Sequence, residues 1–310
     1  MKSAHNYDEC VKKNNWRVIN CRTCGYWHVY PMPEEKELAE YYRNKYYKTL
    51  KGNRSMTDKF NDPDGFYSLQ YADRLRQIHR FLPTGMPKTV IDIGAGYGDF
   101  LSFMKKNNWK VQGSEPSELA FRKIKDNALN IKLCSMNEFE EAGFKPAAVV
   151  ALNNVLEHLR QPQKVLDEVR KHLLLRGGIV SIVMPNDFNI LQDLIMKSVL
   201  KNNPDKRYYW VAPPDHLNYW STCNIGRFLD RCGFKAVFMT CDFPMELFPL
   251  MGEDYVSYPE VGRSAHLKRV RFEKYLHQTG SFKFKDSIFE SFAKLGIGRD
   301  MQVIAVPKRL

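Results

Sequence analysis

The sequence lacks an apolar run close to the roughly twenty residues that a bilayer-spanning helix requires. Its longest apolar run, Ile179 to Met184, has the length of a buried strand. The opening residues, MKSAHNYD, are polar and do not resemble a secretory leader. The seven cysteines are mostly scattered and do not suggest a disulfide framework. These absences argue against a membrane span and against a disulfide-stapled secreted domain, and they predict a cytoplasmic protein.

Internal repeats, low-complexity tracts and short basic clusters that alternate with aromatic residues are also missing. The last absence weighs against nucleic acid as the partner, although the net charge of +12 favours an anionic one. A small anionic molecule, such as a nucleotide-activated sugar, fits both observations. The 310 residues can hold one large domain, or a domain with a small module. The sequence gives no indication of the oligomeric state.

A glycine-rich turn stands at the centre of the sequence pattern. The β-branched run from Val90 to Ile93 predicts a buried strand, and the apolar spacing from Phe100 to Met104 predicts a helix. Three glycines at alternate positions separate the two: Gly94, Gly96 and Gly98. Glycines at a strand-to-helix turn let the backbone bend sharply and let a ligand approach it closely.

Acidic residues surround this turn. Glu115 ends the second predicted strand, which begins at Val111, and a carboxylate there can accept hydrogen bonds from both hydroxyls of a ribose. The glycine spacing departs from the dinucleotide pattern GxGxxG, because the third glycine comes one residue early. Asp92 before the turn and Asp99 after it would repel a pyrophosphate, and the turn itself contains no Lys or Arg. The pattern therefore predicts a nucleoside ligand that carries positive charge.

Strands and helices alternate through the rest of the chain. Further strands are predicted at 130–135, 147–153, 179–184, 235–240 and 301–306, and helices at 66–81, 117–127, 162–175 and 222–232. The helix 162–175 is expected to end at the sequence Arg-Gly-Gly, residues 176–178. This alternation predicts an α/β fold with a parallel, Rossmann-like sheet. Two insertions interrupt it, at 186–220 and 243–299.

The spacing Asp-x-Gly-x-Gly-x-Gly, with an acid downstream, resembles the class I S-adenosylmethionine-dependent methyltransferases. The resemblance covers about residues 66–243 and 300–308. It implies a seven-stranded sheet whose last strand inserts antiparallel beside the sixth, and it implies S-adenosyl-L-methionine as the cofactor. The sulfonium and ammonium groups of that cofactor suit an acidic pocket. The binding residues implied at the turn and at the end of the second strand are Asp92, Gly94, Ala95, Gly96, Gly98, Glu115 and Pro116.

The phrase NVLEHL after the fourth strand, followed by Pro162, resembles the post-strand motif of small-molecule methyltransferases. It implies that Asn153 and Asn154 border the methionine part of the cofactor. Ser135 and Met136, after the third strand, would border the adenine. Some relatives bind a divalent metal here through Glu-x-x-Glu-His. Asn154 replaces the first glutamate of that motif, so a catalytic metal is not expected.

Methyl transfer to a hydroxyl needs alignment of the reactants and a base with a pKa near 7, for which histidine is the usual residue. The candidates are His216 and, as the second choice, His158. His216 lies in YYWVAPPDHLNYW, residues 208–220, which resembles the acceptor-side phrase of relatives. The structural alternatives are that His158 organises its loop and that His216 caps a helix. The aromatic residues around His216, with Asp215 and Asn218, would form either a platform for a sugar ring or an apolar seam.

The N-terminal region contains a zinc-knuckle turn, Cys21-Arg-Thr-Cys24-Gly25. The glycine allows the tight turn that presents two thiolates to one tetrahedral metal. Cys10 precedes the knuckle by about one hairpin, and His5 or His28 could complete the four ligands. His5 is favoured because it lies on the same side of the sequence as Cys10. The predicted structural zinc ligands are therefore His5, Cys10, Cys21 and Cys24, and a metal-free relic of such a site is the alternative.

The complete pattern resembles bacterial methyltransferases of polysaccharide and deoxysugar pathways. It implies a zinc-knuckle module with a helix at 1–60 and a methyltransferase domain at 61–310 that carries the two insertions. The expected reaction is transfer of a methyl group to a hydroxyl, or as second choice a carbon, of a sugar-like small molecule. Two alternatives stay open: an RNA methyltransferase that grips the phosphate backbone, and a non-catalytic protein that only binds S-adenosylmethionine.

Overall fold

The computed structural model describes residues 5–41, 64–124, 126–135, 138–139 and 141–308. The chain forms two compact units. The sheet unit comprises Glu34–Val183, Leu229–Phe238 and Val303–Leu310. The accessory unit comprises Met1–Pro33, Met184–Phe228 and Met239–Gln302. The front of the chain thus groups with residues from both predicted insertions, while the domain boundaries at 60 and 61 stay a prediction.

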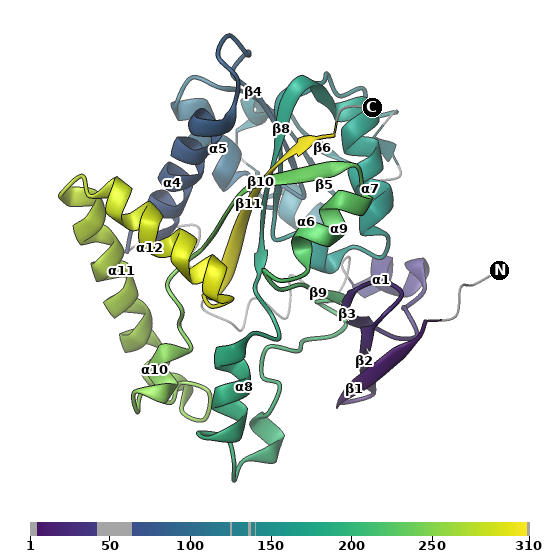
Figure 1. Cartoon of the computed structure of the whole chain (residues 1–310). Coiled ribbons are helices and arrows are strands. Elements are labelled where there is room, and N and C mark those ends of the chain that lie inside the picture. The colour runs from purple at the N-terminus through teal and green to yellow at the C-terminus, as the bar shows by residue number, and fades with distance from the viewer. Residues whose placement is uncertain (1–4, 42–63, 125, 136–137, 140, 309–310) are drawn as a thin grey trace. The chain divides into compact units, whose positions relative to one another are not determined.

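A seven-stranded sheet with the order β10-β11-β8-β7-β4-β5-β6 forms the centre of the fold (Figure 1). Its strands are β4 (Thr89–Ile93), β5 (Lys110–Glu115), β6 (Ile131–Leu133), β7 (Ala147–Asn153), β8 (Leu174–Pro185), β10 (Phe234–Cys241) and β11 (Asp300–Pro307). β4 pairs in parallel with β5 on one side and with β7 on the other. The strand order therefore reverses between β4 and β7, which is where Rossmann-like sheets bind ligands. The predicted Rossmann-like sheet is confirmed.

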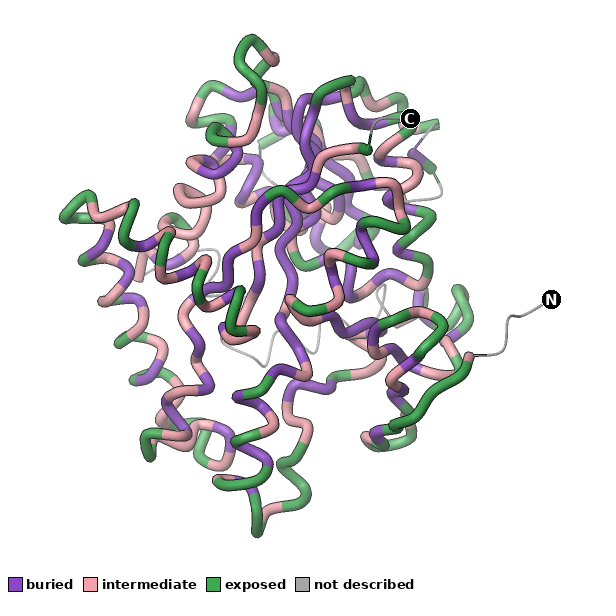
Figure 2. The backbone as a smooth tube through the Cα atoms, viewed as in Figure 1, coloured by how far each residue is buried: buried purple, intermediate pink, exposed green. Residues whose placement is uncertain are grey.

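Helices of the sheet unit flank this sheet. α4 (Phe66–Phe81) and α5 (Asp99–Lys106) lie on one face, and α7 (Pro162–Glu168) lies on the other (Figure 1). The sheet unit also contains the short helices α1 (Glu35–Tyr41) and α6 (Glu118–Phe121), and α9 (Ile225–Arg231) crosses the boundary between the two units. Buried residues concentrate along the strands of the central sheet (Figure 2).

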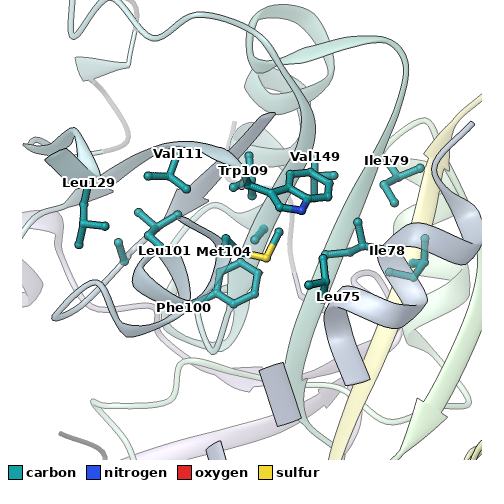
Figure 3. Packing of buried hydrophobic residues seen from close by; sticks show 14 of the residues in the cluster. Leu75, Ile78, Phe100, Leu101, Met104, Trp109, Val111, Leu129, Val149 and Ile179 are labelled. Atoms are coloured by element: carbon teal, nitrogen blue, oxygen red, sulfur yellow. The ribbon is translucent and has the colours of Figure 1, made fainter. Parts of the chain in front are cut away.

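The main apolar core lies between α4, α5 and the strands. Leu75 and Ile78 from α4 pack in one cluster with Phe100, Leu101 and Met104 from α5 and with the strand residues Val111, Val149 and Ile179 (Figure 3). Burying each of these large side chains stabilises the fold by about 1.5–3 kcal/mol. The core therefore fixes the position of the β4–α5 turn, which connects two of its most buried elements.

The end of α7 differs from its prediction. The helix passes through a π-helical turn, Val169–Leu173, directly into β8, so the sequence Arg-Gly-Gly at 176–178 lies inside a strand. Gly177 has φ +84°, and the pairing of β7 with β8 shifts register at this point. A Cβ on Gly178 would lie 2.7 Å from the carbonyl oxygen of Ala148. The two glycines therefore serve a strand irregularity, and the predicted helix cap is wrong.

The accessory unit begins with a small antiparallel sheet in the order β1-β2-β3-β9 (Figure 1). The strands are β1 (Tyr7–Lys13), β2 (Trp16–Cys21), β3 (Tyr26–Val29) and β9 (Asn218–Tyr219). The other elements of the unit are α8 (Ile190–Lys197), α10 (Leu247–Leu250), α11 (Gly262–Gln278) and α12 (Phe282–Leu295). No helix in the described part of the chain has the length and apolarity that a bilayer crossing requires.

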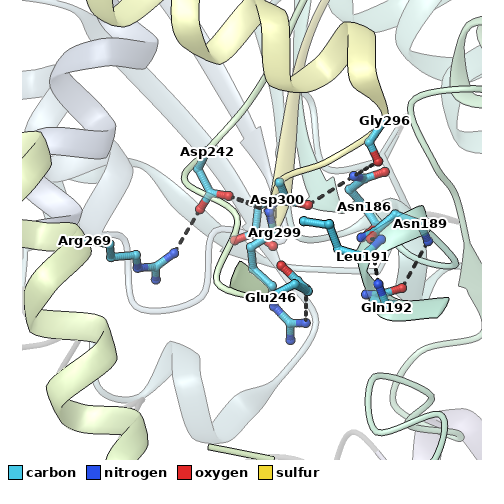
Figure 4. Close-up of polar contacts among 11 residues, drawn as sticks. Asn186, Asn189, Leu191, Gln192, Asp242, Glu246, Arg269, Gly296, Arg299 and Asp300 are labelled. Carbon is cyan, nitrogen blue, oxygen red and sulfur yellow. Dashed lines mark hydrogen bonds and ion pairs between the residues drawn. The ribbon is translucent and has the colours of Figure 1, made fainter. Parts of the chain in front are cut away.

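A buried polar network joins the two ends of the second insertion (Figure 4). Asp242 accepts hydrogen bonds from the backbone N–H groups of Arg299 (2.9 Å) and Asp300 (2.8 Å), and from the Arg269 guanidinium (3.1 Å). Burial and the neighbouring Asp300 raise the pKa of Asp242. Asp242 thus joins the start of the second insertion to its end at Arg299 and Asp300.

Asn186 makes the complementary set of bonds at the start of the first insertion (Figure 4). Its side-chain NH2 donates to the carbonyl oxygens of Gly296 (3.2 Å) and Gly298 (3.1 Å). Its side-chain oxygen accepts from the backbone N–H of Thr222 (3.1 Å). Asn186 is fully buried, so these bonds satisfy a polar group that would otherwise be costly to enclose.

Candidate active site

The glycine turn between β4 and α5 has a backbone that only glycine adopts easily. Gly94, Gly96 and Gly98 have φ values of +68°, +57° and +83°. A Cβ on Gly94 would collide with Val155 at 2.9 Å, and one on Gly98 with Leu129 at 2.8 Å. A Cβ on Gly96 would meet nothing within 4 Å among the described residues. The turn is therefore packed at its two ends and open at its middle, where a ligand can approach the backbone.

The Glu115 carboxylate is held against this turn. One oxygen accepts a hydrogen bond from the backbone N–H of Gly96 at 2.8 Å, and the other accepts from the N–H of Ser117 at 2.8 Å. Glu115 ends β5 with 3% of its surface exposed. Each carboxylate oxygen can accept more than one hydrogen bond. The carboxylate is therefore oriented beside the open middle of the turn.

A chain of hydrogen bonds connects Asp92, at the end of β4, to α4. The side-chain NH2 of Asn153 donates to Asp92 at 3.0 Å, and Arg74 donates to the Asn153 oxygen at 3.0 Å. Burial raises the pKa of Asp92 to about 7, against the opposing effects of the Asn153 hydrogen bond and the Arg74 charge. The Asp92 charge therefore depends on pH in the physiological range.

Two residues that position this edge were not identified from the sequence. Arg74 orients Asn153, and it makes the edge less negative than the acidic turn predicts. Gly113 lies in β5 beneath the turn, where a Cβ would be 2.7 Å from Leu101 and 3.1 Å from Ala95. An isolated glycine in a predicted strand is a signal of such close packing. No local pattern marks Arg74, which lies 79 residues from Asn153 in the chain.

The other predicted donor-site residues that the structure describes lie at the same edge or next to it. The N–H of Ala95 donates to the carbonyl oxygen of Ser114 (2.8 Å). The N–H of Asn154 donates to the carbonyl oxygen of Val183 (2.8 Å). Pro116 directly follows Glu115. Ser135 follows β6, and its N–H and hydroxyl donate to Glu138. Met136 lies outside the described residues.

The family model for a methyltransferase domain matches residues 66–237. The chain belongs to the methyltransferase-domain family. The glycine turn, Glu115, Asp92 and Asn153 all lie within the matched region. The predicted enzyme class, an S-adenosylmethionine-dependent methyltransferase, is confirmed.

Solved structures share the fold of this methyltransferase at low sequence identity. The plantazolicin methyltransferase BamL, in complex with a triazolic desmethylPZN analog and SAH, is 12% identical with a TM-score of 0.52, and the match covers 87% of this chain and 94% of that one. The plantazolicin methyltransferase BpumL, in complex with SAH, is 15% identical with a TM-score of 0.50, and the match covers 88% of this chain and 94% of that one. A SAM-dependent methyltransferase from Archaeoglobus fulgidus is 17% identical with a TM-score of 0.48, and the match covers 79% of this chain and 98% of that one. No curated protein matches the sequence.

The two candidate bases of the methyltransferase belong to different units. His158 ends a 3₁₀ turn, Leu156–His158, directly after β7 in the sheet unit, and it is half-buried. His216 lies in the accessory unit, two residues before β9. Its backbone N–H donates to the carbonyl oxygen of Ala212 (3.0 Å), and its carbonyl oxygen accepts from the hydroxyl of Tyr219 (2.9 Å). His216 is thus fixed in a turn of the segment formed by residues 207–220.

The aromatic residues around His216 are mostly packing residues. Trp210, Tyr219 and Trp220 have at most 4% of their surface exposed, and Asn218 is 1% exposed. These side chains cannot offer a face to a sugar. Tyr208, Asp215 and His216 are only half-buried. Tyr209 is half-buried as well. The predicted platform is therefore reduced to the half-buried residues, and the apolar-seam alternative describes the buried ones.

The N-terminal sheet brings together two histidines and two cysteines. The ligand atoms of His5, Cys21, Cys24 and His28 lie within 4.8 Å of one another. His5 Nδ1 lies 3.3 Å from the Cys21 sulfur and 3.6 Å from the Cys24 sulfur. A nitrogen and a sulfur on one tetrahedral zinc are separated by about 3.6 Å. The four donors therefore have the chemistry and spacing of a structural metal site.

His28 is held as a metal ligand would be. Its Nδ1 is hydrogen-bonded to the carbonyl oxygen of Val29 at 2.8 Å, which leaves Nε2 for a metal. That Nε2 is buried and has no hydrogen-bond partner in the described part of the protein. Burial also lowers the pKa of His28, which favours the neutral ring. Cys10 is not part of the group: it is exposed on β1 opposite Ile19, whereas Cys21 lies opposite Tyr7.

Proposed function

We propose that this methyltransferase binds S-adenosylmethionine at the edge formed by the glycine turn, Glu115, Asp92 and Asn153. Glu115 would accept hydrogen bonds from the ribose hydroxyls, and Gly96 would let the donor approach the backbone. Asp92 would face the ammonium group of the methionine part, and Asn153 and Asn154 would border it. The single observation that supports this best is the Glu115 carboxylate, held by the Gly96 N–H beside the open middle of the turn.

Calorimetric titration with S-adenosylmethionine tests this proposal. Hydrogen bonds to a charged group contribute about 1.5–3 kcal/mol each. Loss of two such bonds in Glu115→Ala should weaken donor binding roughly a hundredfold or more. Glu118→Ala, on the exposed first turn of α6, is the matched control and should bind like the wild type. An unfolding curve for each variant separates a lost contact from a lost fold. Equal affinity in wild type and Glu115→Ala would contradict the proposed donor site.

We further propose that the acceptor is a sugar-like small molecule that is methylated on a hydroxyl, or as second choice on a carbon. A nucleotide-activated sugar or a polysaccharide precursor would suit the net charge of +12. Tyr208, Asp215 and His216 offer an aromatic face, a carboxylate and a base from one segment. His216 would take the proton from the acceptor hydroxyl, while His158, directly after β7, is the second candidate.

A screen of nucleotide-sugars for consumption of S-adenosylmethionine would identify the acceptor. With that acceptor, His216→Ala should lower kcat by about 10²–10⁴-fold, the usual contribution of a general base. Its affinity for the donor should not change. Full activity of His216→Ala would exclude it as the base. If kcat fell strongly in His158→Ala and not in His216→Ala, His158 would be the base.

We also propose that His5, Cys21, Cys24 and His28 bind a structural zinc ion. This ligand set keeps three of the residues expected from the sequence and replaces Cys10 with His28. A Cys2His2 site needs no further ligand, which is typical of a structural zinc rather than a catalytic one. Metal analysis should find one zinc per chain, and Cys21→Ser should lose it while Cys10→Ser retains it. Retention of zinc by Cys21→Ser would disprove the site.

A further inference from the structure

The small sheet that carries the metal cluster also carries the His216 segment. β3 holds the ligand His28, and β9 pairs with it antiparallel, with His28 opposite Asn218 and Trp27 opposite Tyr219. The N–H of Val29 donates to the carbonyl oxygen of Leu217 at 2.8 Å. The metal-binding strand and the strand two residues after His216 are therefore neighbours in one hydrogen-bonded ladder (Figure 1).

Side chains reinforce this pairing on both sides of the ladder. Tyr26 packs against Trp220, with ring centroids 4.8 Å apart. Trp27 stacks on Phe188 at 4.1 Å with nearly parallel planes, and Phe188 in turn contacts the Trp210 ring edge-on at 5.4 Å. The contacts from β3 thus extend along the 207–220 segment on both sides of His216.

The Tyr219 side chain connects β9 to the turn that holds His216 through hydrogen bonds. Its buried hydroxyl donates to the carbonyl oxygen of His216 at 2.9 Å and accepts from the N–H of Ala212 at 3.2 Å. The N–H of His216 closes the same turn on Ala212. One hydroxyl therefore bridges both ends of the turn that presents the candidate base.

The sheet needs help to hold this geometry. β3 has four residues and β9 has two, which is too short for stable pairing without further support. The module that contributes β1–β3 is about thirty residues, below the size at which a hydrophobic core alone stabilises a domain. Two of the four clustered ligands flank the knuckle that turns β2 into β3, and a third lies on β3 itself. A bound metal would therefore fix β3 directly.

We propose that the metal cluster is a positioning device for the His216 segment. Metal bound by His5, Cys21, Cys24 and His28 holds β3, β3 holds β9, and the Tyr219 hydroxyl holds the turn with His216. The metal itself touches no reactant. The inference rests on the proposed zinc site and on the proposed acceptor role of the segment, and it adds that loss of the metal disorders the segment without affecting the donor edge.

Hydrogen–deuterium exchange of the full-length protein, as purified and after chelation, tests this coupling. Chelation should increase exchange at least tenfold in peptides from 16–30 and from 207–220, and leave peptides from 89–115 unchanged. Re-addition of one equivalent of zinc should restore both. Tryptophan emission should shift to the red with the same stoichiometry, because Trp16, Trp27, Trp210 and Trp220 lie in these segments. Faster exchange at 16–30 with unchanged exchange at 207–220 would overturn the proposal, and so would a protein in which zinc affects neither.

The bridge is tested separately by Tyr219→Phe, with Tyr275→Phe on the exposed face of α11 as the control. Tyr219→Phe should retain zinc and the exchange pattern of 16–30, but exchange about fivefold faster at Ala212, the loss expected for one hydrogen bond of about 1 kcal/mol. Exchange at Ala212 as slow as in the wild type would remove Tyr219 from the pathway. Donor titration of the same samples distinguishes the outcomes: failure to bind S-adenosylmethionine refutes the proposed donor site and leaves the exchange result standing.

Discussion

Asp92 gives a quantitative test of how the donor edge works. Burial raises the pKa of its carboxyl to about 7, so roughly one tenth of the molecules carry the charge at pH 6 and nine tenths at pH 8. If the charged form is the one that binds the cationic donor, the apparent association constant follows that fraction. It should rise about tenfold between pH 6 and pH 8, or about 1.4 kcal/mol.

The variant that removes this dependence is Asp92→Asn, which preserves the size of the side chain. The α-amino group of the donor also titrates near pH 8, so the quantity to compare is the ratio of wild-type to variant affinity, in which the ligand's own titration cancels. Calorimetric titration at pH 6, 7 and 8 should give a ratio that rises about tenfold. Asp126→Asn, an exposed partner of Lys105, is the control and should leave the wild-type slope unchanged.

The same pKa has a consequence for stability with the opposite dependence on pH. The pKa of Asp92 is near 3.9 in the unfolded chain and near 7 in the folded protein. At pH values between these two, the folded state binds one more proton than the unfolded state. The contribution of Asp92 to stability is therefore lost as the pH rises through this window, by at most about 4 kcal/mol. Urea unfolding at pH 4.5 and 7.5 should show a smaller loss for Asp92→Asn than for the wild type. A pH-independent affinity ratio together with identical stability slopes would refute the assignment of a titrating, donor-facing Asp92.

Three further predictions concern other parts of the molecule. Asp242→Ala removes the acceptor of the Arg269 guanidinium and of two backbone N–H groups. Urea unfolding should therefore show that the free energy of unfolding falls by about 3–5 kcal/mol. A decrease below about 1 kcal/mol would contradict the network. Gly96→Ala should cost about 1–2 kcal/mol in urea unfolding, because residue 96 has φ +57°, and it should also lower donor affinity in calorimetry, because the added Cβ enters the open middle of the turn; unchanged affinity would show that the ligand does not approach there. Cys21→Ser should lower the melting temperature of the zinc-loaded protein to that of the chelated wild type, and a higher value would mean that the thiolate does not bind the metal.

The elements predicted best are those whose local pattern admits one structure. The 66–81 helix and the 147–153 strand have the predicted bounds, because sixteen residues of helical periodicity and a nearly continuous apolar run each determine their own conformation. The sequence Arg-Gly-Gly at 176–178 was misassigned because a glycine pair suits a helix end and a strand irregularity equally well. Only the pairing of β7 with β8 distinguishes the two.

The candidate site was predictable where neighbours in the sequence are neighbours in space. The glycine turn and Glu115 follow from the ends of adjacent strands. Arg74 and the choice of His28 over Cys10 depend on contacts between distant residues, which no single-sequence pattern records. The packing role of Trp210 was ambiguous for another reason: an aromatic ring beside polar residues suits a ligand face and a buried seam equally, and burial alone decides.

The pairing of β3 with β9 also affects the order in which the protein can form during synthesis. β9 leaves the ribosome roughly 190 residues after β3, which at about 5–20 residues per second is a delay of roughly ten to forty seconds. During that interval the outer edge of β3 has no strand to pair with, and an open edge invites association with other nascent chains. A fragment that ends before residue 218 would keep this edge permanently open, so we expect amino-terminal fragments to aggregate even when their metal site is intact.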